Sequence, residues 1–296
     1  MTPLVAIRCL VYNHEPFLRQ CLDGFVMQQT NFPFVAVVHD DASTDNSAAI
    51  IKEYAAKYPN IFRPIYETEN QYSKPGAISY IMYENSKDAK YMAYCEGDDY
   101  WTDPHKLQRQ VDFLEAHPDY SAIGENGMIL NTITNQTYIF NTHPSQDVSM
   151  EDVIRYRRFP TAGVVCRMDA IKGINEVCKY TPDTVQWCWL ISKGKFRYSD
   201  TVSSVYRRGE QGVTEYSDPF WFGKRIEKWY LEIIRCFPSV DESFVLLWIA
   251  KIYKSMLQRS WRNHNFTSLV KCLFRGGYWT LIAYMHKIKQ CFSHKR

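Results

Sequence analysis

The first 118 residues alternate apolar runs and amphipathic segments in an order that predicts repeated strand–helix units. Four short apolar runs have the continuity of parallel strands buried on both faces: 4–11, 34–39, 61–66 and 91–95. Apolar residues at helical spacing follow these runs, in segments that begin near Pro16, after Asp45, at Gly76 and at Asp103. This pattern predicts an α/β fold with a right-handed, doubly wound, mostly parallel sheet that binds ligands at the carboxyl ends of its strands.

The pattern is less regular after residue 120. Strands are predicted near 121–130, 137–141, 161–167 and 196–206, and helices near 149–157 and 183–193. Beyond about residue 220 the apolar positions predict amphipathic helices. We therefore predict an α/β domain over 1–220, with a ligand-binding half (1–118) and a second half (119–220), and a helical extension over 221–296.

The most informative motif is Glu96-Gly97-Asp98-Asp99, which directly follows the apolar run that ends at Cys95. Crowded carboxylates raise one another's pKa, so a cluster of three is unfavourable unless something neutralises it. A divalent cation does so, and Mg²⁺ or Mn²⁺ takes oxygen ligands and shares them with phosphates. The cluster therefore indicates a metal–diphosphate site, and the alternative is a solvated acidic turn that caps the next helix.

Two further loops with polar side chains follow predicted strands. Tyr12-Asn13-His14-Glu15 comes after the first strand, and Asp40-Asp41-Ala42-Ser43-Thr44-Asp45 comes after the second. Because the carboxyl ends of parallel strands meet at one edge of a sheet, we expect both loops to lie beside the acidic cluster.

These three loops resemble those of the GT-A-fold glycosyltransferases of family 2, the inverting sugar transferases of the bacterial polysaccharide type. The resemblance runs from about Pro3 to Tyr216, with its elements in the same order and at the same separations. It implies a Rossmann-like GT-A catalytic domain over 1–220 that binds a nucleotide-diphospho-sugar. The half from 119 to 220 would then form the acceptor side.

The resemblance also implies roles for individual residues. The nucleotide pocket would be lined by residues of the first loop and of the acidic cluster: Tyr12, Asn13, Glu15, Glu96 and Gly97. Asp41 would accept a hydrogen bond from the base, typically uracil. Asp98, in the family's D-x-D position, would hold a Mn²⁺ or Mg²⁺ ion between the two phosphates, with Glu96 near the ribose. Glu96 replaces the family's usual first Asp, which implies a changed reach with the carboxylate retained.

Inverting transfer also needs a base that removes the proton of the acceptor hydroxyl. In the family this is an Asp or Glu at the start of a helix in the second half of the domain, and Asp183 matches that position. The alternative is that Asp183 only caps its helix, which is a common role for Asp. Glu176 is a weaker candidate for the same role.

Two roles remain possible for each of several other residues. Asp99 would either support the metal site or cap its loop, and Arg207 or Arg208 would contact phosphate or be solvated. Gly212 would give the loop after them freedom to close. Three residues with aromatic rings could contact substrate or have a purely structural role. His14 would contact phosphate, and Trp101 and Trp187 would stack on a sugar face.

The composition also indicates a cellular compartment and an uneven distribution of charge along the sequence. The nine cysteines are odd in number and form no CxxC pair, and the N-terminus enters a strand without a signal-peptide pattern, so we expect a reducing, cytosolic location. The formal charge is +3, from 35 basic and 32 acidic residues. Ten of the basic residues and none of the acidic ones lie in 251–296, which leaves 25 against 32, a net of −7, for 1–250.

The basic tail is also aromatic, with Trp, Tyr and Phe residues throughout 244–296. Amphipathic helices of this composition bind anionic membrane surfaces, so we expect peripheral contact with the inner face of the cell membrane. The alternative is that these helices pack on the catalytic domain or support a dimer. No nucleic-acid-binding module is recognised, and the acidic body argues against nucleic acid as a partner.

We therefore expect a metal-dependent, inverting hexosyltransferase that uses a UDP-linked sugar and acts on a saccharide or lipid-linked saccharide in surface glycan assembly. One alternative is a sugar nucleotidyltransferase, which would need a glycine-rich basic loop where this chain has Tyr12–Glu15. Another is a catalytically silent, membrane-associated protein that binds nucleotide sugars as a scaffold. The presence of Asp41, Asp98 and Asp183 argues against the scaffold.

Overall fold

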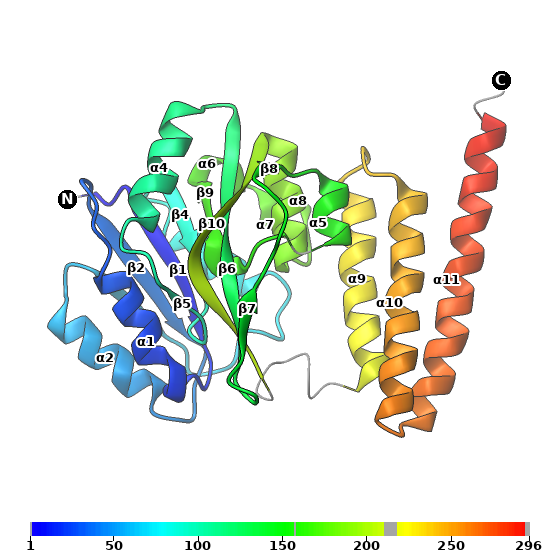
Figure 1. Cartoon of the computed structure of the whole chain (residues 1–296), viewed down its shortest axis with the longest axis horizontal. Helices are drawn as coiled ribbons and strands as arrows, with labels where there is room; N and C mark the ends of the chain where they lie inside the picture. The colour runs from blue at the N-terminus through cyan, green and yellow to red at the C-terminus, as the bar shows by residue number, and fades with distance from the viewer. Residues whose placement is uncertain (1, 157, 210–217, 294–296) are drawn as a thin grey trace. The chain divides into compact units, whose positions relative to one another are not determined.

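The structure is a computed structural model that describes residues 2–156, 158–209 and 218–293, the last six of them by their backbone alone. It divides into two compact units (Figure 1). The first comprises Met1–Asp152 and Arg157–Gly209, and the second comprises Val153–Tyr156 and Glu210–Arg296.

The first unit begins with repeated strand–helix units, as the apolar pattern predicts. Its first four long strands lie in the order β3-β2-β1-β4 and are all parallel: β1 (Val5–Val11), β2 (Phe34–Asp40), β3 (Phe62–Tyr66) and β4 (Tyr91–Tyr94). Four helices follow in sequence: α1 (Glu15–Val26), α2 (Ser47–Lys57), α3 (Ala77–Glu84) and α4 (Lys106–Ala116). The predicted α/β class and doubly wound parallel core are confirmed.

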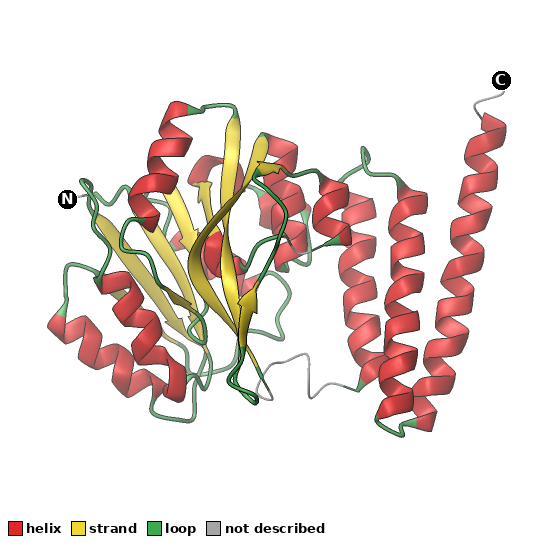
Figure 2. Cartoon of the chain, in the orientation of Figure 1, coloured by secondary structure: helices red, strands yellow, loops and turns green. Residues whose placement is uncertain are grey.

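The second half of this sheet mixes strand directions. Its strands are β5 (Tyr100–Trp101), β6 (Tyr120–Asn131), β7 (Thr137–Ile139), β8 (Gln146–Asp147), β9 (Val164–Arg167) and β10 (Lys195–Arg208). The order continues β4-β9-β6-β10-β5, with β9 antiparallel to both of its neighbours and β6 parallel to β10. The sheet is therefore parallel on one side of β9 and mixed on the other (Figure 2).

Four short helices occur along this half of the sequence: α5 (Met150–Arg155), η1 (Thr161–Gly163), α6 (Met168–Ile171) and α7 (Ile174–Val177). A longer helix, α8 (Asp183–Lys193), follows them. The predicted strand at 161–167 thus starts three residues later than expected, after the turn η1. A close backbone approach explains the turn, because a Cβ at Gly163 would lie 2.2 Å from the carbonyl oxygen of Glu125.

The hydrophobic core of the first unit forms where α1 packs on the sheet. Leu18, Leu22 and Phe25 of α1 are fully buried, together with Ile7 of β1. Helical spacing on α1 and continuous burial of β1 place these side chains in one layer. The packing fixes the start of α1 directly beyond the carboxyl end of β1, where the candidate site lies.

The second unit contains three long helices, α9 (Pro219–Cys236), α10 (Glu242–Arg262) and α11 (Phe266–Ser293), in agreement with the predicted helical extension. Asp218 caps α9 by accepting hydrogen bonds from the backbone N–H groups of Phe220 and Trp221. Tyr230 of α9 donates a hydrogen bond to the carbonyl of Ile154 at 3.1 Å, so α9 contacts the last turn of α5. Among the described residues, no helix has both the length and the low polarity needed to cross a bilayer.

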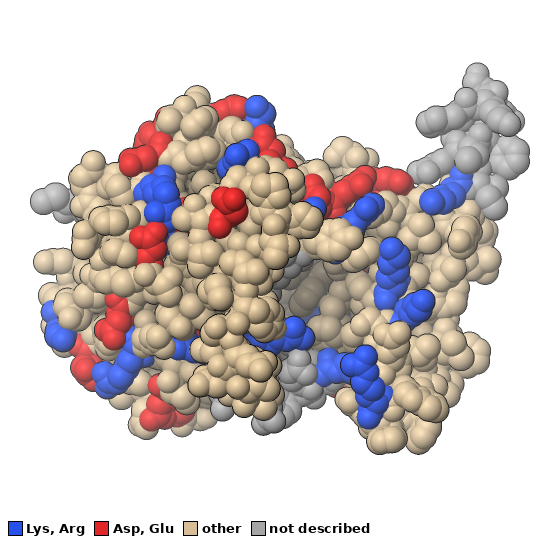
Figure 3. Space-filling view, viewed as in Figure 1, with Lys and Arg blue, Asp and Glu red and all other residues tan. Residues whose placement is uncertain are grey.

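One buried glutamate joins all three helices of the second unit. Glu227 of α9 is 2% exposed, and its carboxylate accepts hydrogen bonds from side chains on every helix of the unit: Lys224 (2.8 Å), Tyr253 (2.7 Å), Arg275 (2.7 and 2.8 Å) and Trp279 (2.8 Å). On the face drawn in Figure 3, basic side chains lie along this unit and its acidic ones lie near the start of α10.

Candidate active site

The three loops that the sequence places together lie at one edge of the parallel sheet. β1 pairs with β2 and with β4 in parallel register, so the segments after Val11, Asp40 and Tyr94 leave the sheet at the same end. Gly97 N–H donates to the carbonyl of Leu10 at 2.8 Å, and Asp41 N–H donates to the carbonyl of Val11 at 2.9 Å. The predicted meeting of the loops is therefore observed.

The first two loops hold each other by hydrogen bonds. Asn13, with φ at 55°, accepts a bond from the backbone N–H of Thr44 at 2.8 Å. The Glu15 carboxylate accepts bonds from the backbone and side chain of Asn46 at 3.0 and 2.7 Å. Both residues therefore shape the edge by joining its loops, whereas the ring of Tyr12 is 47% exposed and available to a ligand.

Asp41 is buried beneath the loop that follows β3. Its carboxylate is 4% exposed and accepts hydrogen bonds from the backbone N–H groups of Gln71, at 2.6 Å, and Tyr72, at 3.2 Å. A carboxylate offers about four lone pairs, so these two bonds leave capacity for a further donor such as a base N–H. The bonds also place the 71–72 backbone beside any base that Asp41 binds.

Glu96 is a half-buried carboxylate with incomplete pairing. One oxygen, Oε1, lies 3.3 Å from Nη1 of Arg8, while Oε2 is buried without a hydrogen-bond partner among the described residues. Burial raises the pKa of Glu96 to about 7; Arg8 opposes this rise, and the negative charges of Asp183 and Asp98 add to it. This carboxylate is therefore destabilised by two other negative charges and lacks a donor on one oxygen.

Asp98 and Asp99 point to different partners. Asp99 is 1% exposed and accepts a hydrogen bond from the backbone N–H of Arg207 at 2.8 Å, so it joins the cluster to β10. Asp98 is half-buried, and its carboxylate receives no hydrogen bond or ion pair within the part of the chain that the structure describes. Asp98 is therefore the member of the cluster whose carboxylate is available to a cation.

Gly97 is required by a close approach between the first and third loops. A Cβ at this position would lie 2.8 Å from Nδ1 of His14 and 2.9 Å from a methyl carbon of Val11. His14 Nδ1 is buried and has no hydrogen-bond partner among residues 2–156, 158–209 and 218–287. Burial lowers the pKa of His14, an effect that the nearby Asp98 charge opposes.

Arg207 supports the acidic cluster, and Arg208 lies at the end of β10. The Arg207 guanidinium donates to the carbonyl of Asp98 at 2.6 Å and to the side chain of Gln20. It also lies over the rings of Phe17 (5.0 Å) and Tyr100 (4.5 Å). Arg208 is exposed, and Gly212 falls outside the described residues.

Asp183 is the first residue of α8, with Pro182 at the N-cap position. Its Oδ2 accepts a hydrogen bond from the hydroxyl of Thr161 at 2.5 Å, and its charge contributes to the raised pKa values of Glu96 and Tyr94. Tyr94 in turn donates its hydroxyl to Gln186, one turn along α8, at 3.2 Å. The predicted base therefore lies near the acidic cluster, whereas the alternative, Glu176, is exposed on α7.

The two tryptophans lie in the core. Trp101 is 2% exposed, donates its indole N–H to the carbonyl of Ala162 at 2.8 Å and contacts Phe25 edge to face at 5.0 Å. Trp187 is 3% exposed and packs edge to face on Tyr94 at 5.2 Å. Of the two assignments that the sequence leaves open for each ring, the structure favours packing.

Sequence reasoning missed two residues of this edge. Arg8 is 5% exposed and pairs with Glu96, and its position inside an otherwise apolar strand was a usable signal for a buried partner. Thr161, 2% exposed, bonds Asp183 from 22 residues away, and no pattern in the sequence connects the two.

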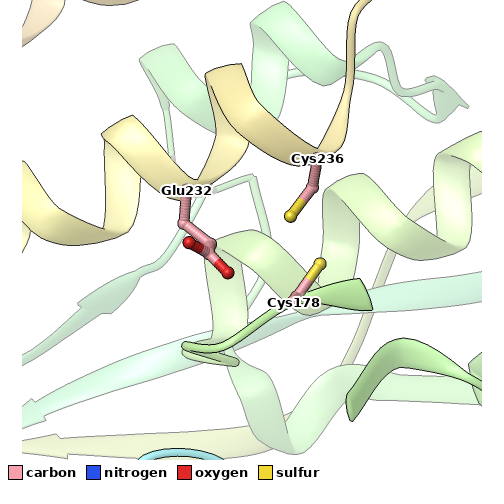
Figure 4. Close-up of side chains that lie close together, drawn as sticks. All are labelled: Cys178, Glu232 and Cys236. Carbon is pink, nitrogen blue, oxygen red and sulfur yellow. The ribbon is translucent and has the colours of Figure 1, made fainter. Parts of the chain in front are cut away.

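A second group of cysteine and carboxylate side chains lies away from this edge of the sheet. Glu232 and Cys236 lie one turn apart on α9, and Figure 4 draws them with Cys178. Glu232 accepts hydrogen bonds from Arg235 at 2.5 and 3.2 Å, so it is already neutralised. Cys178 belongs to the first unit and the other two residues to the second, so the trio carries no metal-site assignment.

Comparison with known proteins identifies the family of the first unit. The sequence model of glycosyl transferase family 2 matches residues 9–197 of the 296. The chain belongs to glycosyl transferase family 2. The matched segment contains the three strand-end loops, the acidic cluster and Asp183.

Relatives of this family 2 chain include proteins with and without a named reaction. An uncharacterised protein of Mycobacterium tuberculosis is 45% identical over 121 residues, which are 39% of this chain and 32% of that protein. The glucosyltransferase WfaP of Escherichia coli, named for transfer from UDP-Glc to alpha-D-GlcNAc-diphosphoundecaprenol, is 22% identical over 69% of this chain and 77% of its own length. The chain thus spans about a third of the mycobacterial relative that it matches.

Solved structures share the fold at low identity. S. aureus TarS (residues 1–349), determined with UDP-GlcNAc, superposes with a TM-score of 0.62 over 84% of this chain and 71% of its own, at 16% identity. The mannosyltransferase PcManGT of Pyrobaculum calidifontis, determined with GDP-Man and Mn²⁺, gives 0.52 over 97% and 85%, at 13% identity. These likenesses confirm the predicted GT-A fold.

Proposed function

We propose that this chain is a metal-dependent, inverting glycosyltransferase that moves a hexosyl group from a nucleotide-diphospho-sugar to a saccharide hydroxyl. The observation that carries the proposal is the meeting of three carboxylates at one edge of the sheet. Asp183 and Asp98 both raise the pKa of Glu96, which supports a candidate base in the electrostatic neighbourhood of a candidate metal site. Membership of glycosyl transferase family 2 supports the same reaction class.

A UDP-linked sugar is the proposed donor. The exposed ring of Tyr12 offers a face on which a base can stack, and Asp41 retains capacity to accept a base N–H. The name of WfaP specifies UDP-Glc, and TarS was determined with UDP-GlcNAc, and both support uracil as the base. PcManGT was determined with GDP-Man, so GDP is the competing nucleotide in the test below.

The residues present fit a divalent cation. Asp98 offers a carboxylate without a partner among the described residues, and Glu96 has a buried oxygen, Oε2, in the same condition. Mn²⁺ or Mg²⁺ takes such hard oxygen ligands, and PcManGT was determined with Mn²⁺. When bound, the ion would stabilise the negative charge of the leaving diphosphate.

Asp183 is the proposed base. Its Oδ2 is held by Thr161, so the carboxylate has a fixed orientation, and proton removal from the acceptor hydroxyl would generate the nucleophile for a single displacement at the anomeric carbon. A single displacement inverts the configuration at that carbon. Arg207 would act indirectly, by holding the Asp98 carbonyl and thus the shape of the acidic loop.

The proposed acceptor is a saccharide, free or lipid-linked, in surface glycan assembly on the cytoplasmic side of the membrane. The name of WfaP specifies a diphosphoundecaprenol-linked acceptor, which supports the lipid-linked form. A nucleotide-sugar-binding scaffold without catalysis is the second candidate, because several predicted site residues, including Asn13 and Glu15, make loop-to-loop contacts of their own.

The first test is calorimetric titration of UDP, GDP and dTDP into the purified chain, with and without Mn²⁺. We expect tight binding of UDP that depends on Mn²⁺ and weaker binding of the other two nucleotides. Turnover of a UDP-sugar by the same preparation supports the enzyme, whereas UDP binding without turnover across a panel of sugars supports the scaffold.

The metal assignment is tested by Asp98→Ala in the same titration. Asp112→Ala is the matched control, because Asp112 is an exposed carboxylate on α4. We expect Asp98→Ala to abolish the Mn²⁺-dependent part of UDP binding and Asp112→Ala to leave it unchanged. Unchanged affinity of Asp98→Ala in Mn²⁺ would remove Asp98 as a metal ligand.

A further inference from the structure

Helix α11 is apolar on two opposite faces, and it buries one of them. Cys272 is 1% exposed, Trp279 7% and Ala283 0%, so this face packs within the helical unit. The other face exposes large apolar side chains along most of the helix: Phe266 (62%), Val270 (49%), Leu273 (57%), Phe274 (75%), Tyr278 (48%), Leu281 (61%), Tyr284 (57%) and Met285 (45%). A helix that is apolar all round is normally buried all round, so the exposed face indicates a partner.

The exposed side chains form one continuous stripe. At about 100° per residue, these eight exposed side chains, from Phe266 to Met285, fall within an arc of roughly 140° on a helical wheel, opposite the buried face. The stripe runs through a little over five turns of the helix at about 3.6 residues per turn. Single exposed apolar residues are common on soluble proteins, but a continuous stripe of this length is not.

Basic residues border the stripe and acidic ones are missing from it. On the same helical wheel Lys271 and Lys287 fall on opposite margins of the apolar arc, and both side chains are exposed. The sequence from Lys251 to Lys287 contains no Asp or Glu. In Figure 3 basic side chains lie along the helices of this unit, and its acidic side chains gather near the start of α10.

The structure also narrows the aromatic region that the sequence indicated. Of the aromatic residues in 244–296, Tyr253 (0%) and Trp279 (7%) are buried and contact Glu227, so they belong to the core of the helical unit. Trp261 is 67% exposed, lies in the last turn of α10 and contacts Phe266 at the start of α11. The exposed aromatics thus concentrate on α11 and on the end of α10 that adjoins it.

We propose that the exposed face of α11 docks on an anionic lipid surface, with the helix axis in the plane of the membrane. Phe, Leu and Val side chains would enter the boundary between headgroups and acyl chains, with Tyr rings at headgroup depth, as in interfacial amphipathic helices. Lys271 and Lys287 would meet the lipid phosphates. A second copy of this chain is a poorer occupant, because a symmetric pair would bring basic margins against one another without an acidic residue to offset them.

This inference is independent of the reaction proposed above, since it concerns only the helical unit. Its test is flotation of the purified full chain with vesicles of phosphatidylcholine alone and of equal parts phosphatidylcholine and phosphatidylglycerol. We expect flotation with the anionic vesicles at low salt and much less with the neutral ones. UDP titration in solution reports the donor site separately, so failure of one proposal is distinguishable from failure of the other.

Two variants locate the contact. Phe274→Ser with Leu281→Ser removes two exposed side chains, and we expect partition to fall at least about tenfold. Lys271→Gln should weaken it about fivefold, the effect of one basic charge near the surface. The matched control is Ile133→Ser in the first unit, which replaces an apolar residue that is 64% exposed. We expect this variant to float as the wild type does.

Three outcomes would overturn the proposal. Equal flotation with neutral vesicles would remove the role of the basic margins. Wild-type flotation by the Phe274→Ser, Leu281→Ser variant would place any membrane contact elsewhere. Absence of flotation in a wild-type chain that self-associates, with the double variant monomeric by sedimentation, would make a second copy the occupant of the stripe.

Discussion

Each of the two units contains a glutamate that is withdrawn from solvent, fully for Glu227 and partly for Glu96, and the two glutamates have opposite surroundings. Glu227 of the helical unit accepts hydrogen bonds from four side chains. Burial alone would raise the pKa of Glu227, but the bonds from Arg275 and Lys224, and then from Tyr253 and Trp279, lower it to about 2. Glu96 of the first unit has one partner, Arg8, and a pKa raised to about 7 by burial and by its acidic neighbours.

The difference distinguishes a structural carboxylate from a functional one. Buried polar groups in proteins are nearly always hydrogen-bonded, and those that are not cluster where a ligand completes the site. Glu227 has its donors within the chain and holds three helices together. Glu96 Oε2 has none among the described residues, which is the condition that a bound cation or substrate would relieve.

The largest expected effect is the loss of catalysis when the proposed base, Asp183, is replaced. Asp183→Asn removes the proposed base and leaves a side chain of the same size, so turnover should fall about 10³-fold while UDP affinity stays within a factor of about two. Transfer rates under saturating donor, together with calorimetric UDP affinity, measure the two effects. Near-normal turnover would exclude Asp183 as the base, and the unfolding midpoint serves as the control for folding.

The next effect is on stability, and it falls on the other glutamate. Glu227→Ala leaves Arg275 and Lys224 without their buried partner, so the helical unit should lose about 3–5 kcal/mol of unfolding free energy. Denaturant unfolding measures the loss, and donor binding in the folded fraction should not change.

Glu242→Ala is the matched control for that change, because Glu242 is half-exposed and its ion pair among the described residues is with His286, for an expected loss of about 0–1 kcal/mol. If Glu227→Ala does not fold, Glu227→Gln, which keeps part of the bonding, should still lose more than Glu242→Ala. Equal losses for both positions would end the distinction between the two glutamates.

The sequence predicted the parallel half of the fold and the meeting of the loops because those depend on local patterns. Continuous apolar runs mark β1, β2 and β4, and polar residues directly after them must share one edge of the sheet. The antiparallel insertion of β9 between β4 and β6 was not predictable in this way, since strand order depends on contacts between distant segments.

The same limit applies to the site and to the helical unit. The hydrogen bond from Thr161 to Asp183 and the burial of Asp41 beneath Gln71 and Tyr72 depend on loops whose paths no periodicity encodes. The apolar positions of α11 were visible in the sequence, but which of its two apolar faces is buried follows only from the packing around Glu227.

A smaller effect concerns the pH dependence of stability, where the two glutamates have opposite signs. The raised pKa of Glu96 means that its ionised form destabilises the fold above about pH 7, and that this loss disappears as the pH falls toward the unfolded-state value of about 4.5. The lowered pKa of Glu227 gives stability that is complete above about pH 4.5 and is lost as the pH falls toward 2.

Glu96→Gln tests this sign directly. The variant should be more stable than the wild type by about 1–3 kcal/mol at pH 8 and by much less at pH 5, measured by denaturant unfolding without added metal. Mn²⁺ should narrow the difference at pH 8, because it binds the ionised wild-type carboxylate. A difference that does not change between pH 5 and pH 8 would mean that Glu96 is not held in an unfavourable ionised state.

The smallest effect separates positioning from catalysis at Asp183. Thr161→Val removes the hydroxyl that bonds Oδ2 and keeps the side-chain volume in a site that is 2% exposed. Loss of one hydrogen bond to a charged group corresponds to about 1–2 kcal/mol, so kcat should fall about tenfold, with no change in the KM for the donor. Thr161→Ser keeps the hydroxyl and should restore most of kcat. If Thr161→Val keeps a normal kcat while Thr161→Ser is slow, the hydroxyl is not what orients Asp183, and Thr161 contributes through its methyl group.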